Sequence, residues 1–162
     1  AVVFHLIRNA HMSVDELDTL FNKRSGMMGL TGFGDLREVH RLVEEGNEDA
    51  KLALDIYVHR IVGYIGNYTA QMGGVDVITF TAGVGENDDV VRKMVCDKLA
   101  PFGVKLDEEK NATRSKEPRI ISTPDSKITI CVIPTNEELA IARKSAAIAE
   151  AGEDTYGNVF SK

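Results

Sequence analysis

Residues 83–87, Gly-Val-Gly-Glu-Asn, combine residue types and spacing that could bind a phosphorylated ligand. They follow a β-branched apolar run, residues 75–81, and precede apolar residues at helical spacing over 90–99. Glycines between a strand and a helix let a phosphate or ribose approach the backbone, and a helix start presents unpaired N–H groups with partial positive charge. The pattern predicts a nucleotide site, and its alternative is an ordinary tight turn that binds nothing.

Residues 83–87, the glycine segment, differ from two well-defined phosphate-binding motifs. Asp88 occupies the place of the third glycine of the dinucleotide-binding fingerprint. No Gly-Lys-Ser or Gly-Lys-Thr follows, so the segment is not a P-loop. Asn87 or Asp88 is expected to cap the following helix. The local pattern alone therefore leaves both interpretations of the segment open.

Glu137 is a second candidate, for binding a divalent cation. Thr135 and Glu138 match a helix capping box, which leaves Glu137 without a role in that motif. Because Glu137 follows a predicted strand, residues 127–133, its carboxylate is expected where ligands bind in open α/β sheets. There it could hold Mg²⁺ directly or through water. The alternative is a first-turn glutamate that only interacts favourably with the helix dipole.

Asp35-Leu36-Arg37 is a third candidate, and it follows a glycine-rich stretch, residues 26–34, that is predicted to be a loop. The guanidinium plane of Arg37 could stack on a base or bind a ribose or phosphate. The alternative is that Asp35 caps a helix and that Arg37 is a solvated side chain.

The elements expected to position these candidates are helices interspersed with strands, which predicts an α/β fold. Helices are predicted over residues 2–8, after a Ser13–Glu16 capping box, from Asp35 to near Gly46, over 48–72 after Asn47, over 90–99, and from Glu137 to about residue 150. Strands are predicted over residues 75–81, 104–106, 119–122 and 127–133, with a turn at 123–126 and a polar loop at 107–118.

The longest predicted helix, residues 48–72, carries a wide apolar stripe. The stripe consists of Leu54, Val58, Ile61, Ile65, Tyr68 and Met72. Such width predicts burial on more than one side of the helix. It also supports an alternative function, a non-catalytic binding or dimerisation module that uses this helix as its interface.

The composition is ordinary for a globular protein, with 162 residues, 43% of them hydrophobic and 27% charged, and a net charge of −6. No block of like charge and no aromatic-plus-basic patch indicates nucleic-acid binding. No signal peptide and no apolar run of membrane-spanning length is present, so no membrane partner is expected. Cys96 and Cys131 are isolated, which predicts buried free thiols in a reducing cytosol and no zinc site.

Several motifs together resemble the acetate kinase (acetokinase) family. They are Phe-Thr-Ala-Gly-Val-Gly-Glu-Asn at 80–87, Ile-Ser-Thr-Pro-Asp at 121–125 and Val-Ile-Pro-Thr-Asn-Glu-Glu-Leu-Ala-Ile-Ala-Arg at 132–143, with further support from residues 20–26 and 46–55. The resemblance covers nearly the whole chain in one order, but only the C-terminal portion of the much longer family chains. Since Ala1 opens within an apolar stripe, we expect this chain to be part of a longer one.

The resemblance implies the C-terminal part of an actin-like (ribonuclease H-like) ATPase domain, an α/β fold with several helices around a mixed sheet. It implies reversible, Mg²⁺-dependent transfer of the γ-phosphoryl group of ATP to acetate, giving acetyl phosphate and ADP. It further implies a cytoplasmic homodimer. Residues 1–150 would be the C-terminal nucleotide-binding domain, incomplete at its N-terminal side, and residues 151–162 a polar tail.

The family's functional residues can be carried over position by position. The resemblance implies that the adenosine-binding Asp-x-Arg motif falls on Asp35, Leu36 and Arg37, the nucleotide loop on Gly83, Val84, Gly85, Glu86 and Asn87, and a magnesium-binding glutamate on Glu137. This chain departs from the family between Gly32 and Asp35, where it is one residue shorter and has Phe33-Gly34 in place of serines.

The family's catalytic groups are expected to precede Ala1. They are a magnesium-binding Asn, catalytic Asp, His and Arg residues, and a His-Leu-Gly-Asn-Gly phosphate loop. Phosphoryl transfer needs positive charge on the transferred group and an in-line acceptor, so we expect residues 1–162 alone to show weak or no turnover. The acceptor pocket would also lie outside this stretch, which leaves propionate or butyrate kinase as alternatives to acetate kinase.

Overall fold

The protein is described here by a computed structural model, in which residues 2–151 are placed. It divides into two compact units, residues 1–75 (unit 1) and 76–162 (unit 2). Of the predicted polar tail, residues 152–162 lie outside the described part of the chain, and one domain over 1–150 stays a prediction. Within the placed residues, no helix combines the length and the apolar character needed to cross a membrane.

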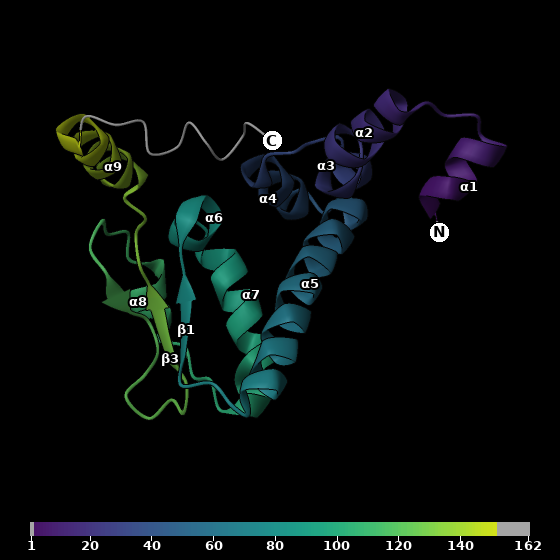
Figure 1. Cartoon of the computed structure of the whole chain (residues 1–162). Helices are drawn as coiled ribbons and strands as arrows, with labels where there is room; N and C mark the ends of the chain where they lie inside the picture. The colour runs from purple at the N-terminus through teal and green to yellow at the C-terminus, as the bar shows by residue number, and fades with distance from the viewer. Residues whose placement is uncertain (1, 152–162) are drawn as a thin grey trace. The chain divides into compact units, whose positions relative to one another are not determined.

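Over its described residues, unit 1 is built from helices, and local capping signals set where most of them begin (Figure 1). The helices are α1 (Val2–Asn9), α2 (Val14–Lys23), α3 (Gly26–Thr31), α4 (Leu36–Glu44) and α5 (Glu48–Met72). The predicted capping box is confirmed, because the Glu16 amide donates to Ser13 Oγ at 3.3 Å and the Ser13 amide donates to Glu16 Oε2 at 2.8 Å. Asn47 caps α5 by accepting from the Ala50 amide at 2.9 Å.

The glycine-rich stretch 26–34 is not a loop throughout, since its first six residues form α3. Gly26 and Gly32, at the two ends of α3, have positive φ angles of 61° and 78°, which favour glycine. Gly29 lies where a Cβ atom would come within 2.8 Å of the Arg24 carbonyl oxygen. The glycines thus serve the two ends of a short, largely exposed helix and one close backbone approach within it, a role that composition alone does not distinguish from a loop.

The long helix α5 has the predicted bounds, but its apolar stripe is buried only in part. Its buried residues, Ala50, Ala53, Leu54 and Val58, all lie in the first half, where α3 and α4 pack against it. Farther along, Tyr64, Tyr68 and Met72 are 52%, 56% and 65% exposed. The expected burial on more than one side is therefore wrong for the second half of α5 in this structure.

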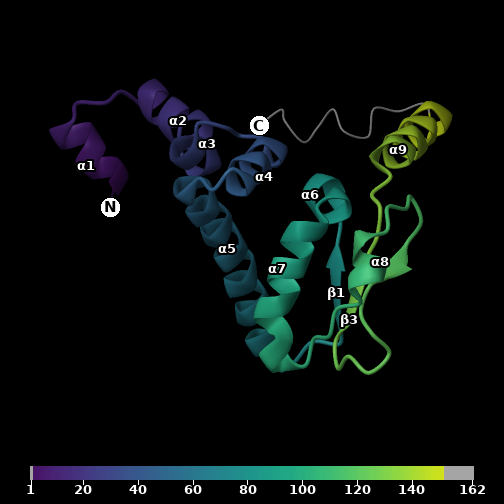
Figure 2. The same cartoon turned by 180° about the vertical axis from the view of Figure 1, so that it is seen from behind.

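Unit 2 is a mixed three-stranded sheet with helices, so the predicted α/β class is confirmed (Figures 1 and 2). Its strands lie in the order β1-β3-β2, with β1 parallel and β2 antiparallel to β3. The elements are β1 (Val77–Phe80), α6 (Ala82–Asn87), α7 (Asp89–Leu99), the 3-10 helix η1 (Ala100–Phe102), α8 (Glu108–Ala112), β2 (Arg119–Ile120), β3 (Thr129–Val132) and α9 (Glu137–Ala151).

Two sequence predictions in unit 2 need correction. The strand predicted at 104–106 is reduced to one bridge between Leu106 and Ser122. The polar stretch 107–118 is not all loop, because α8 forms within it and Asp107 caps that helix by accepting from the Lys110 amide at 3.1 Å.

The core of unit 2 comes mainly from α7 and from the central strand β3. Val91, Val95 and Leu99 of α7 and Ile130 and Val132 of β3 are all buried. Both cysteines are free, as predicted, but only Cys96 is buried while Cys131 is half-buried. Burial raises the pKa of the Cys96 thiol to about 11.

Replacing Ile130 with alanine should destabilise unit 2 by about 2–5 kcal/mol, because a fully buried side chain leaves a cavity. Ile120→Ala, in the adjacent strand, is the matched control, since its side chain is 56% exposed and the change should cost less than about 1 kcal/mol. Urea denaturation of the two variants measures both costs. Equal costs would contradict the assignment of β3 as the core strand.

Candidate functional site

The candidate residues of unit 2 meet at one edge of the sheet. β1 and β3 are parallel with Phe80 beside Val132, and the Ile133 amide donates to the Phe80 carbonyl at 2.9 Å. The chain leaves β1 into α6 and leaves β3 towards α9, so the glycine segment and Glu137 both follow the carboxyl ends of these strands (Figures 1 and 2). Open α/β sheets bind ligands outside this edge.

The glycine segment is helical rather than an open turn. Residues 82–87 form α6, and the Asn87 side-chain amide donates to the Gly83 carbonyl oxygen at 2.8 Å. The chain enters α6 at Ala82, whose φ of 58° is left-handed and costs a residue with a Cβ atom about 1–2 kcal/mol. Such strain persists only where the surrounding structure enforces it, and it gathers at functional sites.

The start of α7 does not suit an anion, contrary to the sequence-based argument about the helix that follows the segment. Asp88, one of the two predicted caps, is the N-cap, and its Oδ1 accepts from the Val91 amide at 2.9 Å. Asp89 adds a second carboxylate in the first turn. These negative charges already complement the helix dipole and would repel a phosphate.

The two glycines of the segment differ in whether the fold requires glycine at their positions. A Cβ atom at Gly85 would lie 3.1 Å from the carbonyl carbon of Phe80, so the packing of α6 against the end of β1 requires glycine there. At Gly83 nothing lies within 4 Å of a Cβ atom, and the φ angle is not left-handed. Neither packing nor the backbone angle requires glycine at position 83.

Arg92 is a residue of this region that the sequence analysis did not identify. Its side chain is buried, and its Nη1 donates to the carbonyl oxygens of Gly85 and Glu86, both at 3.0 Å. Its Nε and Nη2 donate to the side-chain and main-chain oxygens of Asn111 at 2.8 and 2.7 Å. Burial lowers the pKa of Arg92, yet arginine stays protonated in proteins. One guanidinium thus connects α6, α7 and α8.

A sequence signal for Arg92 exists, because it precedes Val95 and Leu99 by three and seven residues and therefore shares their apolar helix face. Its partner Asn111 lies in the stretch predicted to be a loop. The Asn111 side-chain amide also donates to the Asp89 carbonyl at 2.9 Å, which ties α8 to the start of α7.

Glu86 connects α6 to the segment that follows β3. Its Oε1 accepts from the Thr135 amide at 2.8 Å and from the Thr135 hydroxyl at 3.1 Å. These hydrogen bonds, the backbone one foremost, lower the pKa of the Glu86 carboxyl. The capping box predicted for Thr135 and Glu138 is wrong, because Asn136 caps α9 by accepting from the Leu139 amide at 2.9 Å. Thr135 has a partner far away in sequence instead.

Glu137 is the first residue of α9, and its side chain is exposed. Within residues 2–151, no group of three or more His, Cys, Asp and Glu side chains could hold a metal ion. Mg²⁺ does not need such a cage, since it is commonly held by one or two carboxylates together with phosphate oxygens and water. A single exposed glutamate beyond the carboxyl ends of β1 and β3 fits that kind of donor set.

In unit 1, Asp35 and Arg37 form a local pair. Asp35 caps α4 by accepting from the Arg37 amide at 2.9 Å, and its carboxylate also accepts from Arg37 Nε at 3.1 Å and Nη2 at 2.6 Å. The Arg37 hydrogen bonds lower the pKa of Asp35 to about 2. The Arg37 side chain is 89% exposed, so one edge of the guanidinium is fixed while its plane faces solvent. The cap and the binding role predicted for this motif are therefore compatible.

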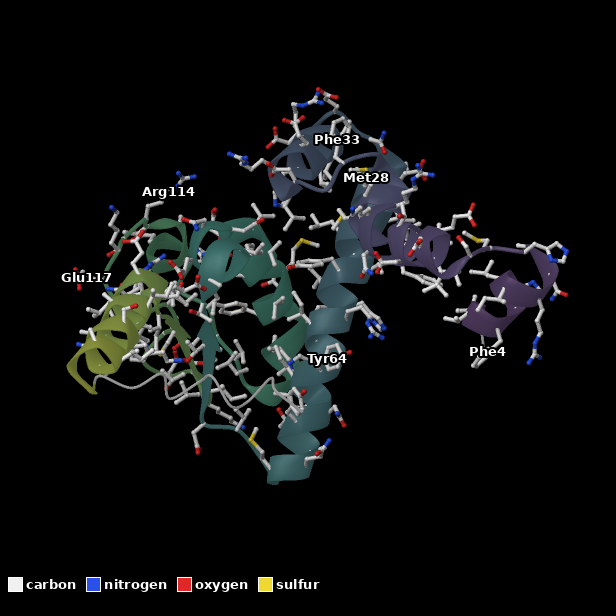
Figure 3. The ribbon with its side chains drawn as sticks, turned by 45° about the horizontal axis from the view of Figure 1, so that its top comes forward. Phe4, Met28, Phe33, Tyr64, Arg114 and Glu117 are labelled. Atoms are coloured by element: carbon white, nitrogen blue, oxygen red, sulfur yellow. The ribbon has the colours of Figure 1, made fainter. Side chains whose placement is uncertain are left out.

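The chain preceding this pair presents apolar side chains. Leu36 is half-buried, whereas Met28 and Phe33 are exposed (Figure 3). The Thr31 hydroxyl bonds both the carbonyl and the amide of Phe33, at 3.0 and 3.1 Å, which holds the loop where this chain departs from the family pattern. These apolar side chains lie close in sequence to Arg37, and apolar and guanidinium groups are the kinds of side chain on which a planar base can stack.

Comparison with known proteins identifies the family. Residues 1–143 match the acetokinase family. The chain belongs to this family. It is 53% identical over 152 residues to the acetate kinase of Leifsonia xyli subsp. xyli, covering 94% of this chain and 38% of that relative. It is 52% identical over 149 residues to the acetate kinase of Corynebacterium efficiens, covering 92% of this chain and 37% of the relative.

Solved structures of the family have the same fold. The Porphyromonas gingivalis acetate kinase matches with a TM-score of 0.81 and 40% identity, over 91% of this chain and 37% of that one. A propionate kinase from Francisella tularensis matches with a TM-score of 0.79 and 37% identity, over 88% and 36%. This chain of the acetokinase family thus spans well under half the length of the relatives that it matches, as the sequence analysis expected.

Replacing Arg92 with methionine should cost about 3 kcal/mol of folding stability, because it leaves the buried Asn111 side chain and three carbonyl oxygens without their donor. Lys93→Met is the matched control on the same helix. It removes only exposed ion pairs with Asp97 and Glu108, so its cost should be much smaller. Thermal and urea unfolding measure both variants, and a mild effect at Arg92 would contradict its connecting role.

Replacing Arg37 with alanine should raise the pKa of Asp35 from about 2 towards its ordinary value, because the main cause of the shift is removed. A carboxyl pKa that is lowered in the folded state stabilises the fold at pH values above the ordinary pKa, near 3.8. This stabilisation is lost as the pH falls to about 2. The variant should therefore lose less stability across this window. Carboxyl chemical-shift titration by NMR measures the pKa, and an unchanged value would contradict the pairing.

Proposed function

We propose that this chain is the nucleotide-binding part of an acetate kinase, which transfers the γ-phosphoryl group of ATP reversibly to acetate in a Mg²⁺-dependent reaction. Membership of the acetokinase family and about 50% identity to acetate kinases support this proposal. The observation that carries it is the meeting of the glycine segment and Glu137 at the carboxyl ends of parallel β1 and β3.

Each candidate residue has a role in this proposal. Gly83 and Val84 give the nucleotide access to the backbone, and Gly85 and Asn87 maintain the helical form of the segment. Glu86 contributes to that form through its backbone carbonyl alone, which Arg92 holds. In unit 1, Asp35 fixes Arg37, whose plane receives the adenosine together with Leu36. The contacts reported above support these roles: the open space at Gly83, the enclosed Gly85 and the paired, exposed Arg37.

Glu137 is proposed as this chain's own ligand to Mg²⁺. When bound, Mg²⁺ neutralises charge on the phosphate oxygens of ATP. Glu137 would hold the ion directly or through water, and its exposure at the ligand-binding edge supports that role. We also propose a cytoplasmic location, a homodimeric whole protein and residues 1–150 as one nucleotide-binding domain, as expected for the family.

The acceptor acid is proposed to be acetate, with propionate or butyrate as the alternatives. The similarity to a propionate kinase structure keeps the alternatives open. A coupled assay of the full-length protein with MgATP and each of the three acids would distinguish them. The acid with the highest kcat/KM is the acceptor, and no ADP formation with any of them would contradict the proposal.

A non-catalytic binding or dimerisation module is the second candidate, supported by the exposed second half of α5. Tyr64 and Tyr68 stack there with ring centroids 6.4 Å apart, and the Cζ atom of Arg60 lies 5.2 Å from the Tyr64 ring centroid. Aromatic and arginine side chains are typical of interface centres. A mass that rises with concentration, together with no response to millimolar MgATP, would favour this module.

Residues 1–162 alone should form little or no acetyl phosphate, because the chain supplies nucleotide contacts and one metal ligand but no groups for the acceptor. The same chain should still gain thermal stability on addition of MgATP. Assay of acetyl phosphate against the full-length protein measures the first, and thermal unfolding the second. Turnover comparable to that of the full-length protein would contradict the proposal that the groups acting on the acceptor lie outside residues 1–162.

Replacing Gly83 or Gly85 with alanine should have opposite effects on the ligand-free protein. Gly83→Ala should stabilise it by up to about 1 kcal/mol, since alanine favours helix and the site is open. Gly85→Ala should destabilise it by about 1–3 kcal/mol, because its Cβ meets the Phe80 backbone. Urea unfolding measures both changes.

The same pair tests the proposed nucleotide contact. Gly83→Ala should reduce the stabilisation by MgATP despite its more stable fold, and the larger Gly83→Val should abolish it, as should Arg37→Ala in the other unit. Thermal unfolding with increasing MgATP is the measurement. An unchanged nucleotide response in Gly83→Val would exclude position 83 from the nucleotide site.

A further inference from the structure

Glu86 belongs to the glycine segment, yet its carboxylate forms hydrogen bonds with another part of the chain. Its Oε1 accepts two hydrogen bonds from Thr135, at 2.8 Å from the amide and 3.1 Å from the hydroxyl. The two residues are 49 positions apart in sequence. A side chain engaged in this way is a poor candidate for a direct contact to a negatively charged nucleotide, which it would also repel.

The backbone of Glu86 is held independently of its side chain. Buried Arg92 donates to the carbonyl oxygens of Gly85 and Glu86, both at 3.0 Å. The position of α6 therefore does not depend on Thr135. The carboxylate reaches from a fixed helix to the segment after β3, so it is this segment that the contact positions.

The segment after β3 has little else to position it. Every residue of α9 from 137 to 149 is exposed, so packing of those side chains does not orient the helix. Pairing with β1 ends at the hydrogen bond from the Ile133 amide to the Phe80 carbonyl. Asn136 caps α9 by accepting from the Leu139 amide, which is a hydrogen bond within α9 itself. Thr135 lies between this last strand contact and Glu137.

We propose that Glu86 is a positioning residue, which acts through Thr135 to set the place of Glu137 relative to the glycine segment. This inference rests on the proposed function, because it gives Glu137 its role at Mg²⁺. In it, Glu86 makes no direct contact with the nucleotide. The contact makes the binding of the metal depend on a residue of the nucleotide segment that does not itself ligate the metal.

The experiment measures ATP binding by the full-length protein with and without Mg²⁺, by the shift of its thermal unfolding. Glu86→Ala should raise the Mg²⁺ concentration for half-maximal stabilisation about tenfold, as is typical when a group that orients a metal ligand is lost. Binding of ATP in the absence of Mg²⁺ should stay as in the wild type. Glu86→Gln should restore the Mg²⁺ response, because its Oε1 can still accept from Thr135.

Thr135→Val is the matched variant on the other side of the contact. It removes the hydroxyl and keeps the amide donor, so its Mg²⁺ requirement should lie between those of the wild type and Glu86→Ala. In the double variant the two effects should not add, since both act on one contact.

Three results would overturn the inference. They are an unchanged Mg²⁺ requirement in Glu86→Ala, an equal loss of ATP binding with and without Mg²⁺, which would make Glu86 a direct nucleotide contact, and failure of Glu86→Gln to restore the response. A wild-type protein that ignores ATP under both conditions would contradict the proposed function itself.

Discussion

The architecture of unit 2 depends on one buried charge. Taking a guanidinium out of water costs several kcal/mol unless its donors find acceptors, and Arg92 finds four of them. The acceptors belong to Gly85 and Glu86 of α6 and to Asn111 of α8. Both helices are too short to be stable in isolation. The Arg92 guanidinium therefore fixes α6 at the end of β1. The hydrogen bonds between Glu86 and Thr135 then connect α6 to the segment after β3.

Elements governed by interactions within a few residues could be predicted from the sequence. The bounds of α5 follow from Asn47 at its start and left-handed Gly73 at its end, and the start of α2 follows from the Ser13–Glu16 capping box. The parallel strands were recognisable because their β-branched runs are bounded by turn residues. Each of the three candidate motifs also lies next to the strand or helix predicted for it, although the glycine segment is helical rather than a turn.

What the sequence could not show depends on partners that are distant along the chain or on the shape of the backbone. Thr135 matches a capping box, but a carboxylate 49 residues earlier competes for it and Asn136 takes the cap. Only the structure shows that the fold requires glycine at position 85 and not at position 83, because left-handed Ala82 turns α6 back onto Phe80. Local patterns thus locate a site, while the division of work among its residues comes from tertiary contacts.

The exposure of α9 has a consequence for the local stability of the chain. A helix of 15 residues with no buried side chain between 137 and 149 gains little from tertiary packing and is marginal by itself in water. Its amide hydrogens are therefore expected to exchange with solvent far sooner than those of β3, from which only four residues separate it. Glu137 lies at the boundary between the strand, which is expected to exchange slowly, and the helix, which is expected to exchange quickly. A ligand bound at Glu137 would therefore be expected to slow amide exchange in the first turn of α9.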